Sequence, residues 1–256
     1  MKKIVFFDID GTLLDNDKKL PESTKEAIWK LKESGVFVAI ATGRAPFMFK
    51  ELREELEIDS FVSFNGQYVV FENKVIYKNP LDPTELENLI NYSASHKHPL
   101  VFLNEKEMTS NIENHQFIRS SIESLKIKHP SFDPDFYKGR EIYQSLLFCE
   151  EKDEVLYLDE FKKFYFLRWH EFSMDVLPKG GSKAEGIKKM IEKIGFKLED
   201  VYAFGDGLND IEMLEAVGTG IAMGNALDVV KQHANYVTSD VMNNGIANGL
   251  KHFKLI

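Results

Sequence analysis

The sequence predicts an α/β fold in which a doubly wound parallel sheet is interrupted by an inserted α+β unit. Apolar runs typical of strands buried on both faces alternate with helical segments in the first third of the chain. This texture changes at Pro80 and Pro83 and resumes after Gly180 and Gly181. Because strand–helix–strand order implies right-handed crossovers, we expect a discontinuous, Rossmann-like core.

Helix and strand signals place the elements of the first segment. Apolar residues recur at helical spacing in 22–34, with Pro21 at its start and Gly35 after its end. The expected elements are strands 4–7, 36–41 and 61–64, helices 22–34 and 47–56, and a hairpin of strands 68–71 and 74–77.

The inserted unit is less regular, and the last segment returns to the first pattern. In the insertion we expect helices 84–95, 113–125 and 152–161 and strands 100–103, 143–148, 164–168 and 173–177. Ser182 and Glu185 predict a capping box at the start of a helix that ends at Gly195. Strands 201–204, 220–223 and 236–238 and helix 211–217 follow. The predicted domains are a core of 1–81 and 180–256 and a cap of 82–179.

Composition restricts the class of protein and its partners. The 256 residues suit one large domain or two small ones, and 43% hydrophobic with 29% charged residues is typical of a globular chain. The net charge of −9 argues against general nucleic-acid binding, which needs clustered Lys and Arg, but permits a small phosphorylated substrate. It leaves the oligomeric state open, as a monomer or a small homo-oligomer.

The sequence gives little indication of membrane targeting or of reactive thiol chemistry. The apolar run 4–7 ends at Asp8, too early for a signal peptide, and no apolar stretch approaches the roughly 18 residues of a membrane span. We therefore expect a cytoplasmic protein that does not contact membranes. The single Cys149 excludes an intramolecular disulfide, and its apolar surroundings indicate a buried structural thiol rather than a nucleophile.

The strongest chemical signal is Asp8-Ile9-Asp10-Gly11-Thr12, directly after the first strand. A charged residue there is costly unless it faces a ligand, because the carboxyl ends of parallel strands open into the binding crevice. Asp8 and Asp10 are two residues apart, so in an extended chain they face one pocket. One carboxylate can attack while the other transfers a proton, and Gly11 lets backbone N–H groups approach an anion. The alternative is a solvated turn or a helix cap.

Two weaker signals suit the same crevice. Thr42 and Gly43 follow the second strand and offer a hydroxyl and an open backbone, although a Thr–Gly pair after a strand is usually a turn. Lys183 in the first turn of a helix opposes the helix dipole, which calls for a compensating carboxylate or phosphate. An exposed Lys that tolerates a small penalty is the alternative.

A fourth signal is the acidic turn Gly205–Asp210, again after an apolar strand. Oxygen ligands close to a second Asp pair suit a hard cation, best Mg²⁺. The competing interpretation is helix capping by Asn209 or Asp210, which is compatible with metal binding by other members of the turn.

These motifs, their order and their spacing resemble the haloacid dehalogenase-like (HAD) phosphohydrolase superfamily. The insertion after the third strand and hairpin is similar to the subgroup with the larger α/β (type IIB) cap, which includes the Cof-type sugar-phosphate phosphatases. The resemblance covers both core segments, and for the cap it rests on position and length only. The second Asp of the Asp8–Thr12 motif argues against the dehalogenases, which lack it.

The resemblance implies a role for each motif residue. Asp8 is the expected nucleophile that becomes an aspartyl-phosphate, and Asp10 the general acid and then the base. Mg²⁺ is expected on Asp8, the main-chain carbonyl of Asp10, and Asp206. The expected phosphate-binding residues are Gly11, Thr42, Gly43, Lys183 and Asn209, with Asp210 supporting the metal and the lysine.

The predicted function is Mg²⁺-dependent hydrolysis of small phosphomonoesters, either sugar phosphates or a phosphorylated cofactor. Arg44 and Asn65 lie on core loops near the expected mouth and are candidates for substrate contact, while a surface or interdomain salt bridge is the alternative for Arg44. A sugar phosphomutase would use the same aspartyl-phosphate, and a non-catalytic regulator would bind phosphometabolites without turnover. The three functions differ in their product: the hydrolase releases free phosphate, the mutase gives an isomerised phosphate ester, and the regulator gives neither.

Overall fold

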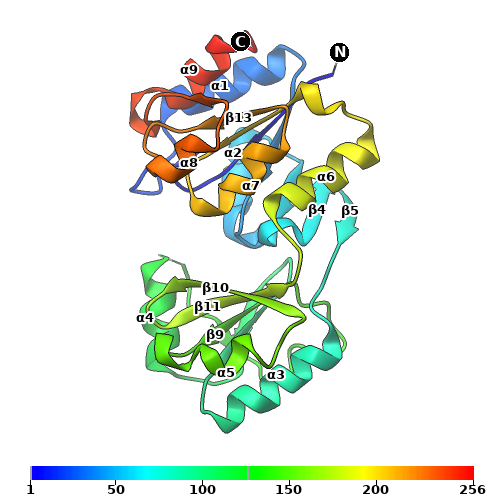
Figure 1. The fold of residues 1–256 in the computed structure, drawn as a ribbon, viewed down its shortest axis with the longest axis vertical. Helices are drawn as coiled ribbons and strands as arrows, with labels where there is room; N and C mark the ends of the chain where they lie inside the picture. Colours follow the sequence, from blue (N-terminus) through cyan, green and yellow to red (C-terminus); the bar gives the residue numbers. More distant parts are fainter. Residues whose placement is uncertain (1, 126) are drawn as a thin grey trace. The chain divides into compact units, whose positions relative to one another are not determined.

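The computed structural model describes residues 2–125 and 127–256, which form two compact units (Figure 1). The core unit comprises the described residues up to Arg44, together with Phe49–Lys78 and Ser182–Ile256. The inserted unit comprises Ala45–Met48 and Asn79–Gly181. The chain thus leaves the core after Lys78, three residues before the sequence-based boundary, and returns at Ser182.

One mixed sheet forms the centre of the core unit. The β3–β4 and β4–β5 pairings are antiparallel, and the other pairings of this sheet are parallel. In spatial order the strands are β14 (Tyr236–Val237), β13 (Thr219–Ala222), β12 (Val201–Gly205), β1 (Ile4–Phe7), β2 (Phe37–Ala41), β3 (Phe61–Ser63), β4 (Tyr68–Phe71) and β5 (Lys74–Lys78).

Helices cover both faces of this sheet, which confirms the predicted doubly wound α/β class (Figure 1). Alternate residues of β1 point to opposite faces of the sheet. Ile4 and Phe6 pack in one cluster with Ile187 of α6. Phe7 stacks on Phe204, with their ring centroids 5.1 Å apart. Each buried side chain of this size stabilises the fold by about 1.5–3 kcal/mol. The core helices are α1 (Glu22–Glu33), α2 (Lys50–Leu56), α6 (Lys183–Ile194), α7 (Ile211–Ala216), α8 (Asp228–Gln232) and α9 (Gly245–His252).

The start of α6 lies directly against the strained turn that follows β3. Phe64, Asn65 and Gly66 have φ of +52°, +50° and +96°. A Cβ on Gly66 would lie 2.0 Å from the carbonyl oxygen of Ser182, and one on Gly186 would lie 2.4 Å from a Val62 methyl. Glycine at both positions therefore permits the backbone contact that fixes the first turn of α6.

In the inserted unit, two helices pack on one face of a second sheet. Leu86 and Leu89 of α3, with Tyr157 and Phe161, cover strand residues such as Phe102. The sheet order is β10 (Phe164–His170), β11 (Ser173–Pro178), β9 (Gln144–Phe148), β6 (Leu100–Leu103), β7 (Met108–Ser110) and β8 (Ser131–Phe132). The helices are α3 (Pro83–Ser95), α4 (Gln116–Ser124) and α5 (Val155–Leu158).

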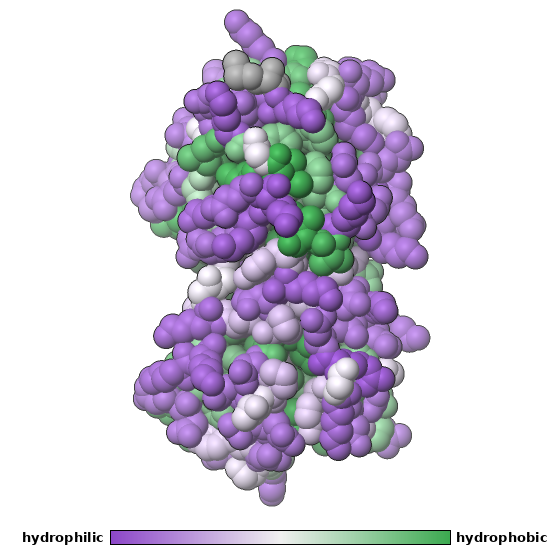
Figure 2. All heavy atoms as spheres, turned by 90° about the vertical axis from the view of Figure 1, so that its right-hand side faces the viewer, coloured by the Kyte–Doolittle hydropathy of each residue, from purple (hydrophilic) through white to green (hydrophobic). Residues whose placement is uncertain are grey.

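Short 3₁₀ turns connect several of these elements. They are η1 (Pro46–Phe49), η2 (Phe64–Gly66), η3 (Glu151–Asp153), η4 (Leu198–Asp200), η5 (Leu208–Asp210) and η6 (Val241–Asn243). The visible face in Figure 2 is mainly hydrophilic, in keeping with the high charge content, and hydrophobic atoms gather on it only in places.

Several local predictions were wrong. The helix expected over 152–161 is a 3₁₀ turn followed by the short α5, because the N–H groups of Asp153, Glu154 and Tyr157 bond to carbonyls three residues back, the 3₁₀ pattern, rather than four. Only half of the capping box forms: Ser182 Oγ accepts from the Glu185 N–H at 3.3 Å, whereas the Glu185 carboxylate accepts from Lys188 at 2.7 Å. Helices α8 and α9 and strands β7 and β8 were not predicted.

The structure also bears on two further expectations, the unreactive Cys149 and the absence of a membrane span. Cys149 is buried, and burial raises the pKa of its thiol to about 11, so the thiolate is scarce at neutral pH. Among the described residues, no helix combines the length and the apolar character needed to cross a bilayer.

The contact at Gly66 predicts a large steric penalty. Gly66→Ala should destabilise the protein by about 3 kcal/mol, because it adds left-handed strain and a clash with the Ser182 carbonyl. Gly35→Ala is the matched control: its φ is +77°, but its Cβ would meet nothing within 4 Å, so we expect about 1 kcal/mol. Urea unfolding measures both, and equal losses would refute the steric argument.

Candidate functional site

The carboxyl end of β1 begins the site. The Asp8 N–H donates to the Phe204 carbonyl of β12 at 3.0 Å, so the backbone is still part of the sheet where the carboxylate leaves it. Asp8 is only 7% exposed. The chain then turns at Gly11, whose φ is +81° and whose N–H donates to the Leu14 carbonyl at 2.9 Å.

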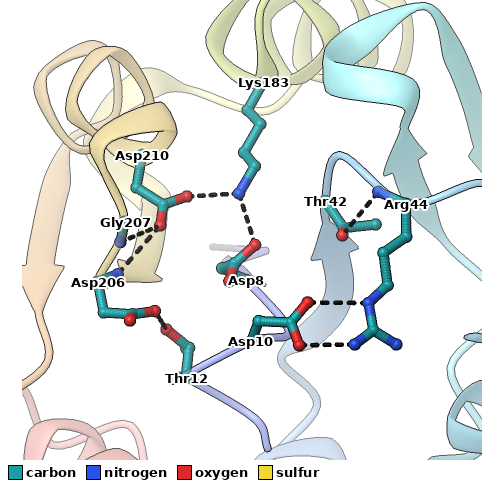
Figure 3. Close-up of polar contacts among 9 residues, drawn as sticks. All are labelled: Asp8, Asp10, Thr12, Thr42, Arg44, Lys183, Asp206, Gly207 and Asp210. Atoms are coloured by element: carbon teal, nitrogen blue, oxygen red, sulfur yellow. Dashed lines mark hydrogen bonds and ion pairs between the residues drawn. The ribbon is translucent and has the colours of Figure 1, made fainter. Parts of the chain in front are cut away.

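Lys183 bridges two buried carboxylates (Figure 3). Its Nζ donates to Asp8 Oδ1 at 2.5 Å and to Asp210 Oδ1 at 2.7 Å, and it is 1% exposed. Burial lowers the pKa of Lys183, but the charges of Asp210 and Asp8 outweigh burial and raise it, so the amine is protonated. The sequence predicted that a lysine at a helix start needs a compensating anion. Two carboxylates, those of Asp8 and Asp210, provide it.

Asp210 has both oxygens occupied. Oδ1 accepts from Lys183, and Oδ2 accepts from the N–H groups of Asp206 at 3.0 Å and Gly207 at 2.9 Å. A Cβ on Gly205 would lie 2.6 Å from Asp210 Cγ, so glycine is needed there for the carboxylate to reach this position. Asp210 thus holds the turn after β12 and orients Lys183.

Asp206 lies against the loop that follows β1. Thr12 Oγ1 donates to Asp206 Oδ1 at 2.9 Å, and a Cβ on Gly11 would lie 2.1 Å from Asp206 Oδ2. Glycine at 11 is therefore required for Asp206 to approach, a second reason for it beyond its positive φ.

The acidic cluster fits a divalent cation. Asp8, Asp206 and Asp210 each offer an oxygen within 4.8 Å of the others, yet a single ammonium, Lys183, contacts them in the described residues. Burial raises the pKa of Asp8 to about 7 and that of Asp206 to about 6, which reflects the cost of ionising both. Asp210 already accepts three hydrogen bonds, whereas Asp8 and Asp206 each accept one from the described side chains, so Asp8 and Asp206 are the more available ligands for a hard cation.

Asp10 faces a different partner, Arg44 (Figure 3). Arg44 Nε donates to Asp10 Oδ2 at 2.8 Å and Nη2 donates to Oδ1 at 2.6 Å, and Lys18 Nζ donates to Oδ1 at 2.5 Å. Burial acts to raise the pKa of Asp10, but the hydrogen bonds and charges of Arg44 and Lys18 prevail and lower it.

Thr42, Gly43 and Asn65 meet beside the end of β2. Thr42 is 2% exposed, and its carbonyl accepts from the Asn65 N–H at 3.1 Å. Its Oγ1 accepts from the Arg44 N–H at 3.1 Å. A Cβ on Gly43 would lie 3.1 Å from Asn65 Nδ2, so glycine lets the two loops approach.

Comparison with known proteins identifies this arrangement. A family model for haloacid dehalogenase-like hydrolases matches residues 5–250. The chain belongs to the haloacid dehalogenase-like hydrolase family. This HAD-family chain is 51% identical to "Putative phosphatase YkrA" of Bacillus subtilis (strain 168), over 99% of this chain and 98% of that one.

Two further relatives define the enzyme class. Pyridoxal phosphate phosphatase YbhA of Escherichia coli (strain K12) is 30% identical, over 96% of each chain. The solved structure of the HAD subclass IIB sugar phosphatase BT4131 superposes with a TM-score of 0.84 at 31% identity and covers 100% of both chains. The predicted family, its IIB subgroup and the phosphatase class are thereby confirmed.

The HAD-family motifs thus converge only in part. Asp8, Asp206, Asp210 and Lys183 form one contact network, whereas Asp10 and Arg44 form another. Asn209 is exposed in η5, with its side-chain oxygen beside Gly207. Its expected phosphate contact, like the other individual roles, stays a prediction.

Sequence reasoning missed three residues of the site. Thr12 stands in the recognised motif but was given no role, although it donates to Asp206. Asn225 follows β13, and its Nδ2 donates to the Gly11 carbonyl at 2.8 Å, so its place after a parallel strand was a usable signal. Lys18 had no signal: it is a partly exposed loop lysine with φ of +63°.

Removal of the Lys183 ammonium should be costly. Lys183→Met leaves Asp8 and Asp210 buried without their cation, and we expect a loss of about 3 kcal/mol at pH 7 without added metal. The loss should shrink towards pH 5, because burial already raises the pKa of Asp8 to about 7, and without the Lys183 charge this carboxylate takes up a proton more readily.

The matched control lies on the same helix. Lys188 forms an exposed pair with Glu185, so Lys188→Met should cost less than about 0.5 kcal/mol. Urea unfolding across pH measures both variants. A Lys183→Met protein as stable as Lys188→Met would show that the buried pairs do not stabilise the core.

Proposed function

We propose that this HAD-family phosphatase hydrolyses small phosphomonoesters with Asp8 as the nucleophile. The observation that carries the proposal is the buried Asp8 carboxylate, held by Lys183 at the end of β1 and next to an acidic pair suited to a cation. Asp10 follows on the same turn and supplies a second carboxylate for proton transfer.

The proposed reaction has two balanced steps. In the first, an Asp8 oxygen attacks phosphorus, the bond from phosphorus to the ester oxygen breaks, and Asp10 gives its proton to the departing alcohol. In the second, Asp10 takes a proton from water as that water attacks the aspartyl-phosphate. The bond to Asp8 then breaks, and inorganic phosphate leaves.

Charge placement is the main contribution of the remaining residues. Phosphoryl transfer depends on positioning and on neutralising charge at the phosphoryl oxygens. Lys183 places a buried ammonium beside the nucleophile, and Thr42 with the Gly43 backbone lies on the neighbouring strand end. When bound by Asp8, Asp206 and the Asp10 carbonyl, Mg²⁺ would offset the repulsion between carboxylates and phosphate.

Sugar phosphates and phosphorylated cofactors are the proposed substrates. One relative is named a sugar phosphatase and another a pyridoxal phosphate phosphatase, and both match this chain along nearly its whole length. A panel of sugar phosphates, nucleotides and pyridoxal phosphate would rank them. Accumulation of an isomerised phosphate ester in place of free phosphate would favour the phosphomutase.

Asp8→Asn tests the nucleophile. The amide cannot form the acyl phosphate, so we expect phosphate release to fall by about 10³-fold or more while the protein stays folded. Phosphate release with Mg²⁺ measures the effect, and circular dichroism checks the fold. A variant with wild-type rates would remove Asp8 from the mechanism.

Metal removal tests the cation site. A chelator should abolish phosphate release and Mg²⁺ should restore it. Mg²⁺ at about 100 times its Kd should stabilise the wild type by roughly 2.7 kcal/mol, because binding favours the folded state. Asp206→Asn should lose most of this stabilisation in thermal unfolding. Full activity in chelator would contradict a metal role.

A further inference from the structure

The hydrogen bonds from Arg44 hold the Asp10 carboxylate more tightly than proton transfer alone requires. A guanidinium that engages both oxygens of a carboxylate fixes its plane as well as its distance, which a single lysine contact does not. The pair is partly exposed, at 25% for the Arg44 side chain and 38% for that of Asp10, so its net stabilisation is small. Orientation is therefore its main physical effect.

The base of the Arg44 side chain is fixed as well. Its N–H donates to Thr42 Oγ1 at 3.1 Å, and its carbonyl accepts from the Phe64 N–H at 3.3 Å. Arg44 thus connects the loop after β2 to the loop after β1, which are the ends of two adjacent parallel strands. The guanidinium holds Asp10 from a backbone anchored on both sides.

The hydrogen bonds distinguish the two Asp10 oxygens. Oδ1 accepts from Arg44 Nη2 and from Lys18 Nζ, which fills both of its lone pairs. From the described residues, Oδ2 accepts only Arg44 Nε, so one of its lone pairs is free. In this orientation Oδ2 is the oxygen that can carry a proton.

We propose that Arg44 is a positioning residue that fixes the Asp10 carboxylate so that Oδ2 exchanges protons with the leaving group and with water. The inference rests on the proposed function, because it acts through the acid–base role of Asp10. Arg44 itself contacts neither reacting atoms nor phosphate in this role, in contrast to the substrate contact expected from the sequence.

Leaving-group dependence tests this role. An alkyl phosphate needs a proton on its departing oxygen, whereas p-nitrophenyl phosphate departs as a stable anion. For Arg44→Met we expect kcat/KM to fall at least about 10-fold on the alkyl phosphate that the wild type hydrolyses best, and less than about 3-fold on p-nitrophenyl phosphate. The assays use full-length protein saturated with Mg²⁺.

The controls separate positioning from charge and from folding. Lys25→Met removes a different cation–carboxylate pair of the core unit, the one between Lys25 and Glu55 at 2.8 Å, and should leave both rates unchanged. Arg44→Lys keeps the charge but loses the two-pronged contact, so it should restore less than half of the lost rate. Arg44→Gln replaces Arg44→Met if the latter fails to fold.

A double-mutant cycle gives the sharpest comparison. If Arg44 acts through Asp10, adding Arg44→Met to Asp10→Asn should not lower the alkyl-phosphate rate further. Equal losses on both substrates, a matching rise in KM on both, full rescue by Arg44→Lys, or additive losses would each overturn the proposal. A wild type that releases phosphate from no substrate would instead overturn the proposed function, and this inference with it.

Discussion

The buried ammonium of Lys183 is the interaction on which the rest of the site depends. It lies between Asp8, directly after β1, and Asp210, after β12, two segments that converge only when the sheet is complete. Asp210 in turn accepts the Asp206 N–H and so sets the backbone of the second acidic residue. One cation therefore connects Asp8, the proposed nucleophile, with the acidic turn and α6.

Close backbone approach is the constraint that makes this charge placement possible. Gly66 and Gly186 let the first turn of α6 lie against the end of β3, and this turn carries Lys183. Gly11 and Gly205 leave room for the carboxylates of Asp206 and Asp210. The site therefore requires glycine at all four of these positions, because a Cβ at any of them would lie less than 3 Å from another atom.

The sequence was sufficient for the sheet and for the convergence of the acidic motifs, since both follow from apolar runs that end in charged residues. It was insufficient for pairwise contacts. Nothing in the spacing of Asp10 and Arg44 shows that the two side chains turn toward each other, because that depends on the loop conformation after each strand. The local hydrogen-bond pattern was also beyond the sequence, since the helix expected over 152–161 begins as a 3₁₀ turn and its α-helical part ends at Leu158.

The discontinuity of the core unit has a consequence for biosynthesis. Asp8 and Asp10 emerge early from the ribosome together with β2 and β3, but β12, which pairs with β1 on its other side, follows the whole inserted unit. The inserted unit has its own hydrophobic core and can fold during this interval, because domains generally fold as units. The acidic turn and Lys183 arrive afterwards, so a partly synthesised chain has the proposed nucleophile Asp8 but not the groups proposed to activate it.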